Sequence, residues 1–192
     1  MFFFNHLSSK CSLFCLAALI STTASATHTE SINGELSGDY TAPDIIALSS
    51  GNNTITGTIG NNGNTGSTNG SDADYFSFNL NSNQTLTEIN ILSFVGSNNV
   101  SFFGYVEDSA FAGQEGSDVD GFELINAASG NVILDIIGGP ITDTTLSFWL
   151  QETADTIVDY SIEFVVQEVP VPPAFLLFAT SIFGLAFAKR KR

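Results

Sequence analysis

The chain has 192 residues, enough for one ordinary domain with accessory segments, and its 20 Asp and Glu against 5 Lys and Arg give a formal net charge of −15. No Lys or Arg occurs between Cys11 and Ala188, and all 20 acidic residues lie between Glu30 and Glu168, so that stretch carries a formal charge of −20. Such a body repels nucleic acid and anionic lipid, which excludes a nucleic-acid-binding role.

The first 26 residues are predicted to be a secretory signal peptide. Lys10 precedes an apolar run at 13–20, and Ala24 and Ala26 form a small-x-small exit, with cleavage expected after Ala26. The alternative, a transmembrane anchor, needs roughly 20 apolar residues, and this run is far shorter. We therefore expect the mature chain to be exported.

The body is predicted to consist of short strands. Residues 27–42 are polar and are expected to lead into a domain at 43–168. In the Gly-, Asn-, Ser- and Thr-rich stretch at 49–74, only 54–59 is typical of a strand. Beyond it, apolar and polar residues alternate with a period of two, as in half-buried strands. The further strands expected are 73–80, 85–94, 99–107, 130–137, 144–151 and 156–166.

This alternation predicts which side chains face the core. Phe76 and Phe78 share one face opposite Tyr75, and Phe148 faces inward opposite Trp149. In the predicted strand 130–137, alternation places Val132, Leu134 and Ile136 on one side. No stretch of the body has apolar residues sustained at helical spacing. The pattern therefore predicts an all-β fold, an antiparallel β-sandwich of about seven to nine strands that is jelly-roll-like.

The strand that opens with Asp-x-Asp-aromatic and the later Tyr-x-aliphatic strand carry a resemblance. Over about two-thirds of the body, the sequence resembles bacterial pre-peptidase C-terminal domains and related secreted jelly-roll sandwiches, which implies a similar fold. The matching positions are Asp72, Asp74, Tyr75, Phe78, Tyr160 and Ile162.

Two acidic motifs are candidate calcium sites. The first contains Asp72 and Asp74, and the second contains Asp118, Asp120 and Glu123, so both place hard oxygen ligands at alternating positions near turns. Neither matches an EF-hand loop, and the alternative is that these acids are solvated turn residues. Calcium is the one cofactor that these motifs suggest.

Four aromatic residues are candidates for stacking on sugar rings if they are exposed on a common face: Tyr75, Phe103, Tyr105 and Trp149. The alternative is that they pack in the core, which is the commoner fate of such side chains.

The residue inventory argues against an enzyme. Both cysteines lie within residues 1–26, and after cleavage His28 is the sole imidazole of a body that lacks Lys and Arg. Serine and cysteine triads, Schiff-base chemistry and zinc sites therefore lack their partners. A glycoside hydrolase that uses two carboxylates is the one catalytic hypothesis left, and it ranks third.

The tail at 169–192 is apolar and then basic. Residues 174–188 are uncharged, but a helix of that length spans only about 22 Å against a hydrocarbon core of about 30 Å, which makes a marginal transmembrane helix. The basic residues that follow would stay on the cytoplasmic side and leave the acidic body outside. A permanent C-terminal anchor and a helix buried in the domain are the alternatives.

A Val-Pro-x-Pro opening, a short apolar helix and a basic stop resemble the PEP-CTERM sorting signal of Gram-negative bacteria, which an exosortase recognises. Val171 stands where that family has Glu. The matching residues are Val169, Pro170, Pro172, Pro173, Gly184, Lys189, Arg190, Lys191 and Arg192.

The two resemblances and the charge pattern lead to one expectation of function. We expect a non-enzymatic protein of the cell surface or extracellular matrix, associated with exopolysaccharide or biofilm. Its expected partners are signal peptidase and the secretion machinery, an exosortase-like enzyme, and the inner membrane before processing. The alternative is a carbohydrate-binding or calcium-dependent adhesive module.

Overall fold

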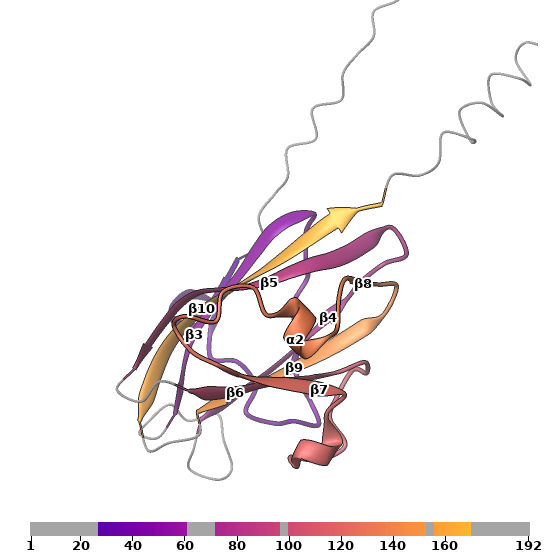
Figure 1. The fold of residues 1–192 in the computed structure, drawn as a ribbon. Helices are drawn as coiled ribbons and strands as arrows, with labels where there is room; N and C mark the ends of the chain where they lie inside the picture. Colours follow the sequence, from indigo (N-terminus) through magenta and orange to yellow (C-terminus); the bar gives the residue numbers. More distant parts are fainter. Residues whose placement is uncertain (1–26, 61–71, 97–99, 153–155, 170–192) are drawn as a thin grey trace, which may run out of the picture.

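Two five-stranded sheets pack face to face in the computed structural model, which describes residues 27–60, 72–96, 100–152 and 156–169 (Figure 1). The first sheet has the order β1 (Thr27–Thr29), β3 (Gly51–Gly60), β10 (Ile157–Glu168), β5 (Gln84–Gly96), β8 (Ile141–Thr142). The second sheet has the order β2 (Asp44–Ile45), β4 (Ala73–Asn79), β9 (Thr145–Glu152), β6 (Ser101–Val106), β7 (Gly121–Ile125). The short helices are α1 (Glu30–Asn33), the 3₁₀ turn η1 (Gly116–Asp118) and α2 (Ile133–Ile136).

The fold is a mostly-β sandwich, as predicted, but its sheets are mixed rather than antiparallel. β1 runs parallel to β3, and β2 runs parallel to β4, whereas the other neighbours are antiparallel. The described residues contain ten strands, more than the seven to nine or so that alternation predicted. Alternation missed four of the strands: β1, β2 and β8 have only two or three residues each, too few to show a period, and β7 was also not predicted.

An aromatic core fills the space between the sheets. Phe148 on β9 lies at its centre, with ring centroids 5.6 Å from Phe76, 5.5 Å from Phe103 and 5.2 Å from Phe164, and all four rings are fully buried. Burying one such side chain stabilises the folded state by about 1.5–3 kcal/mol. The predicted inward positions Phe76 and Phe148 are confirmed.

A second apolar cluster covers the outer face of the second sheet. Tyr75 and Trp149 stack there with a centroid distance of 5.7 Å, and Phe111 packs edge-on against both rings. Tyr75 and Trp149 point away from the main core, as alternation predicted. They are nevertheless buried, because the chain after β6 folds back over them.

The predicted strand at 130–137 is wrong. Residues 133–136 form α2, which packs against β5 of the first sheet and β7 of the second. The buried residues are Val132, Ile133 and Ile136, a helical spacing, whereas Leu134 is 69% exposed. Four residues are too few for this spacing to stand out against an alternating pattern in the sequence.

The polar segment 27–42 belongs to the sandwich rather than only leading into it. β1 pairs with β3 of the first sheet, the Tyr75 N–H donates to the Ser37 carbonyl oxygen on the second sheet at 2.9 Å, and Leu36 is buried in the main core. This segment therefore joins the two sheets.

The aromatic core predicts a large loss of stability on truncation at its centre. We expect Phe148→Ala to lower the free energy of unfolding by about 3–5 kcal/mol, because it leaves a cavity among rings that cannot collapse into it. Leu134→Ala is the control, since its exposed side chain should matter by less than about 0.5 kcal/mol. Urea unfolding followed by tryptophan fluorescence measures both, and equal losses would contradict the assigned core.

Candidate functional site

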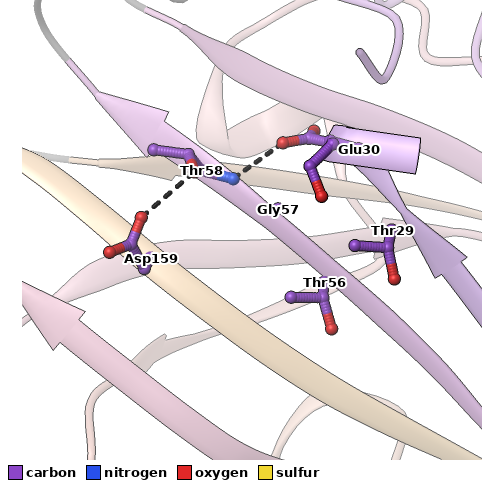
Figure 2. A pocket seen from close by; sticks show the side chains of 7 residues that line it. Thr29, Glu30, Thr56, Gly57, Thr58 and Asp159 are labelled. Carbon is purple, nitrogen blue, oxygen red and sulfur yellow. Dashed lines mark hydrogen bonds between the residues drawn. The ribbon is translucent and has the colours of Figure 1, made fainter. Parts of the chain in front are cut away.

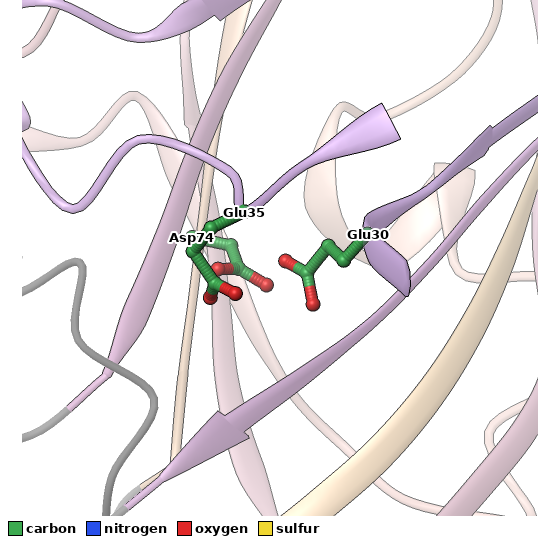
Figure 3. A group of neighbouring side chains, drawn as sticks. All are labelled: Glu30, Glu35 and Asp74. Atoms are coloured by element: carbon green, nitrogen blue, oxygen red, sulfur yellow. The ribbon is translucent and has the colours of Figure 1, made fainter. Parts of the chain in front are cut away.

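Three carboxyl groups converge where the two sheets meet the segment 27–42 (Figure 3). Glu30, Glu35 and Asp74 each place one carboxylate oxygen within 4.8 Å of the other two. We call these three residues the carboxylate cluster. Glu30 and Glu35 come from the N-terminal segment and Asp74 comes from β4, so residues about 40 positions apart in the sequence share one site.

Backbone N–H groups and one glycine hold Glu30 in place. Its Oε2 accepts a hydrogen bond from the Thr58 N–H at 2.8 Å, and its Oε1 accepts a longer one from the Leu36 N–H at 3.4 Å. A side chain at Gly57 would put its Cβ 2.5 Å from the Glu30 carboxyl carbon. The glycine therefore makes room for this carboxyl group beside β3.

Asp74 lies on the core side of β4 and is fully buried. Its Oδ2 accepts a hydrogen bond of 2.6 Å from the hydroxyl of Tyr160, which is on β10 of the opposite sheet. Its Oδ1 is also buried and accepts no hydrogen bond. One oxygen of the Asp74 carboxylate thus connects the two sheets through Tyr160, whereas the other has no hydrogen-bond donor.

Exposure changes in steps across the cluster. Glu35 is exposed, Glu30 is half-buried and Asp74 is buried. Figure 3 shows the three carboxyl groups pointing toward one another. Asp74 is therefore the buried end of the cluster, and Glu35 is its solvent-exposed end.

The pKa values of the cluster follow from this crowding. Burial, and then the charge of Glu30, raise the pKa of Asp74 well above its ordinary value despite the Tyr160 hydrogen bond. Burial likewise raises the pKa of Glu30. Partial desolvation of its carboxyl group, with the charges of Glu30 and Asp72, raises the pKa of Glu35 to about 7.

No lysine or arginine side chain of the body neutralises the cluster. No Lys or Arg occurs between residues 11 and 188, so no such side chain of the body is available to pair with these acids. Protons or an added cation can compensate them. The arrangement can therefore take up protons or hold a hard cation through oxygen ligands.

The structure separates the two predicted calcium motifs. Asp74 belongs to the cluster, and Asp72 is buried beside it, where its charge acts on Glu35. Asp118 Oδ2 accepts a hydrogen bond from the Glu115 N–H, and Asp120 Oδ2 accepts one from the Glu107 N–H. These two acids therefore accept hydrogen bonds from backbone N–H groups of the loop that follows β6.

Glu123, the third acid of the second motif, lies on β7 opposite Phe103. Sequence reasoning missed Glu30 and Glu35, because isolated acids in a polar segment give no signal until the fold places them beside β4.

The predicted sugar-stacking rings are not exposed. Tyr75 and Phe103 are fully buried, and Tyr105 and Trp149 are each 6% exposed. Tyr75 and Trp149 belong to the outer cluster, and Phe103 and Tyr105 belong to the main core, so the four rings do not share a face. Their buried faces leave no room for a sugar ring, so the expectation that they are exposed is wrong.

A shallow hollow lies beside the carboxylate cluster on the first sheet (Figure 2). Its volume is about 170 Å³, and its exposed lining is more apolar than polar, although most of its residues carry a hydroxyl or carboxyl group: Thr29, Glu30, Ser31, Thr56, Gly57, Thr58 and Asp159. The Thr58 hydroxyl donates to Asp159 Oδ1 at 3.1 Å. Glu30 thus contributes to both the hollow and the cluster.

Most residues of the predicted signal-peptide cleavage site and of the C-terminal sorting signal lie outside the residues that the structure describes. This holds for Ala24 and Ala26 and for the tail from Pro170 to Arg192. Val169 is described, and its N–H donates to the Asn83 carbonyl oxygen at 2.8 Å. Within the described part of the chain, no helix is both long and apolar enough to span a membrane.

No protein-family model matches the chain, and no curated protein matches its sequence. The class that the fold defines is a two-sheet, β-rich sandwich domain.

The raised pKa values predict a pH dependence. With divalent cations removed by EDTA, we expect the melting temperature of the full chain to fall as the pH rises from about 4.5 to about 7. Glu35 holds its proton more tightly in the folded state, so the stability present below pH 4.5 is lost as the pH rises through its folded pKa of about 7. The titratable groups that act on Glu35 are Glu30 and Asp72, and Asp74 is the third member of its cluster.

Glu35→Gln should flatten this decline more than Glu107→Gln, which removes the same formal charge from an exposed position on another loop. Thermal melts by circular dichroism across this pH range make the comparison. Identical pH profiles for the two variants would contradict the assigned environment of Glu35.

Proposed function

We propose that this chain is a non-enzymatic protein exported to the cell surface or extracellular matrix of a Gram-negative bacterium, where it is associated with exopolysaccharide. One observation carries the proposal: a strongly acidic body without Lys or Arg stands between a signal-peptide-like start and a Pro-x-Pro, apolar and basic end. Every Lys and Arg of the chain lies in one of the two end segments, where its charge orients that segment in the membrane.

The ends also define the proposed partners and route. Signal peptidase and the secretion machinery act on residues 1–26. The helix at 174–188 then holds an inner-membrane intermediate until an exosortase-like enzyme recognises the tail at 169–192. The protein reaches the surface or matrix after this step and contributes to a biofilm.

We further infer that the sandwich is of the jelly-roll type found in pre-peptidase C-terminal domains. The hydrogen bond between Asp74 and Tyr160 supports this inference, because these are two of the residues on which the resemblance rests. They belong to β4 and β10, which lie in opposite sheets.

A carbohydrate-binding adhesive module is the second candidate, and the hollow on the first sheet favours it. Threonine hydroxyls and the Asp159 carboxylate suit the hydroxyl groups of a sugar, and the hollow has room for about one sugar ring. Because the aromatic candidates are buried, recognition would depend on these hydrogen bonds.

The export proposal predicts the mass of the mature protein. Intact-mass spectrometry of the protein from its native host should show a chain that starts at Thr27 and lacks everything after about Pro173. A chain that ends at Arg192 would contradict sorting and indicate a permanent anchor. Retention of residues 1–26 would contradict export, and release of reducing sugar from polysaccharide by the purified protein would contradict the non-enzymatic role.

The second candidate predicts that the hollow retains polysaccharide. In a pull-down on the host's own exopolysaccharide, Thr58→Val should weaken binding roughly 2- to 10-fold, as expected for one lost hydrogen bond. Thr145→Val is the matched control, because Thr145 also makes an exposed cross-strand hydrogen bond, to Asn79, but on the second sheet. An equal effect of both variants, or no retention by the parent chain, would exclude binding at this hollow.

A further inference from the structure

We propose that the carboxylate cluster of Glu30, Glu35 and Asp74 is a binding site for one divalent cation, and that calcium is the cation it suits best. The site differs from both acidic motifs visible in the sequence, because two of its three ligands come from the segment 27–42. The proposal does not depend on export or sorting.

The spacing of the ligand atoms supports a single ion. The three oxygens lie within 4.8 Å of one another. Calcium binds oxygen at about 2.3–2.6 Å, so two ligands on opposite sides of the ion are about 4.6–5.2 Å apart. Oxygens that lie within 4.8 Å of one another can therefore fit around one ion.

The buried carboxylate of Asp74 gives a second, independent reason to infer a bound cation. Its Oδ1 is fully buried and accepts no hydrogen bond, although its Oδ2 is satisfied by Tyr160. A buried carboxylate oxygen without a donor is costly unless a positive charge compensates it. The body contains no Lys or Arg to do so, and one carboxylate oxygen of Asp74 lies within 4.8 Å of oxygens of Glu30 and Glu35. A bound cation satisfies this atom and offsets the repulsion among the three acids.

Calcium suits this site better than magnesium. The ligands come from three positions of different exposure, and the exposed Glu35 leaves water free to complete the coordination. Calcium accepts six to eight oxygen ligands in irregular geometry, whereas magnesium requires a near-ideal octahedron with shorter bonds. A calcium ion here would bind the N-terminal segment to β4 and so reinforce the junction of the two sheets. Its binding would release protons and weaken as the pH falls.

The test is calcium titration of the full chain after EDTA treatment at fixed ionic strength, followed by calorimetry and thermal melts. We expect one calcium ion per chain at this site, a higher melting temperature, and a smaller effect of magnesium. Glu35→Gln should weaken calcium binding by at least about tenfold, since one of three charged ligands is lost.

Glu107→Gln is the matched control, because it removes an exposed glutamate outside the cluster and should leave the affinity unchanged. Asp74→Asn should abolish binding, and the exposed Glu35 variant keeps the test valid if the buried variant fails to fold. Equal weakening by the two glutamine variants would indicate general screening of the acidic surface and overturn the proposal. A melting temperature that calcium does not change would overturn it too.

Discussion

Every carboxylate of the sandwich must be hydrated, protonated or compensated without a lysine or arginine of the body. All 20 acidic residues lie in a stretch that contains neither type, so no ion pair with a lysine or arginine can form within that stretch. Cohesion must therefore come from apolar burial and from backbone hydrogen bonds. The rest of the structure follows from this constraint, including which acids stay at the surface and what happens where they cannot.

The aromatic core is the main source of the apolar burial that stabilises the domain. Phe148 contacts rings from both sheets, and the outer cluster around Tyr75 and Trp149 adds a second dry layer on the far side of β4 and β9. Aromatic side chains bury a large area each and require no charged partner. The same packing buries Tyr75, Phe103, Tyr105 and Trp149, so these four rings are not available for stacking on a sugar.

At the carboxylate cluster, apolar burial alone cannot compensate for the absence of lysine and arginine. Glu30 and Asp74 are brought inside by the segment 27–42 and by β4, and their pKa values rise because the protein offers them backbone N–H groups and the Tyr160 hydroxyl but no cation. Glu30 also borders the hydroxyl-lined hollow. A cation bound at the cluster would therefore influence the shape of that hollow, which connects the proposed calcium site with the adhesive role considered as the second candidate.

The sequence by itself determined the mostly-β class, the inward face of strands such as β4 and β9, and the separation of an acidic body from two basic-containing ends. These are local properties, because a period of two and a count of charges can be read within a few residues. Only the tertiary structure decided that the short parallel strands β1 and β2 join the sheets, that 133–136 is helical, and that Tyr75 and Trp149 are covered. It also decided the candidate site. Glu30 and Glu35 meet Asp74 because the chain folds the segment 27–42 across both sheets, and no local pattern encodes a contact between residues so far apart along the chain.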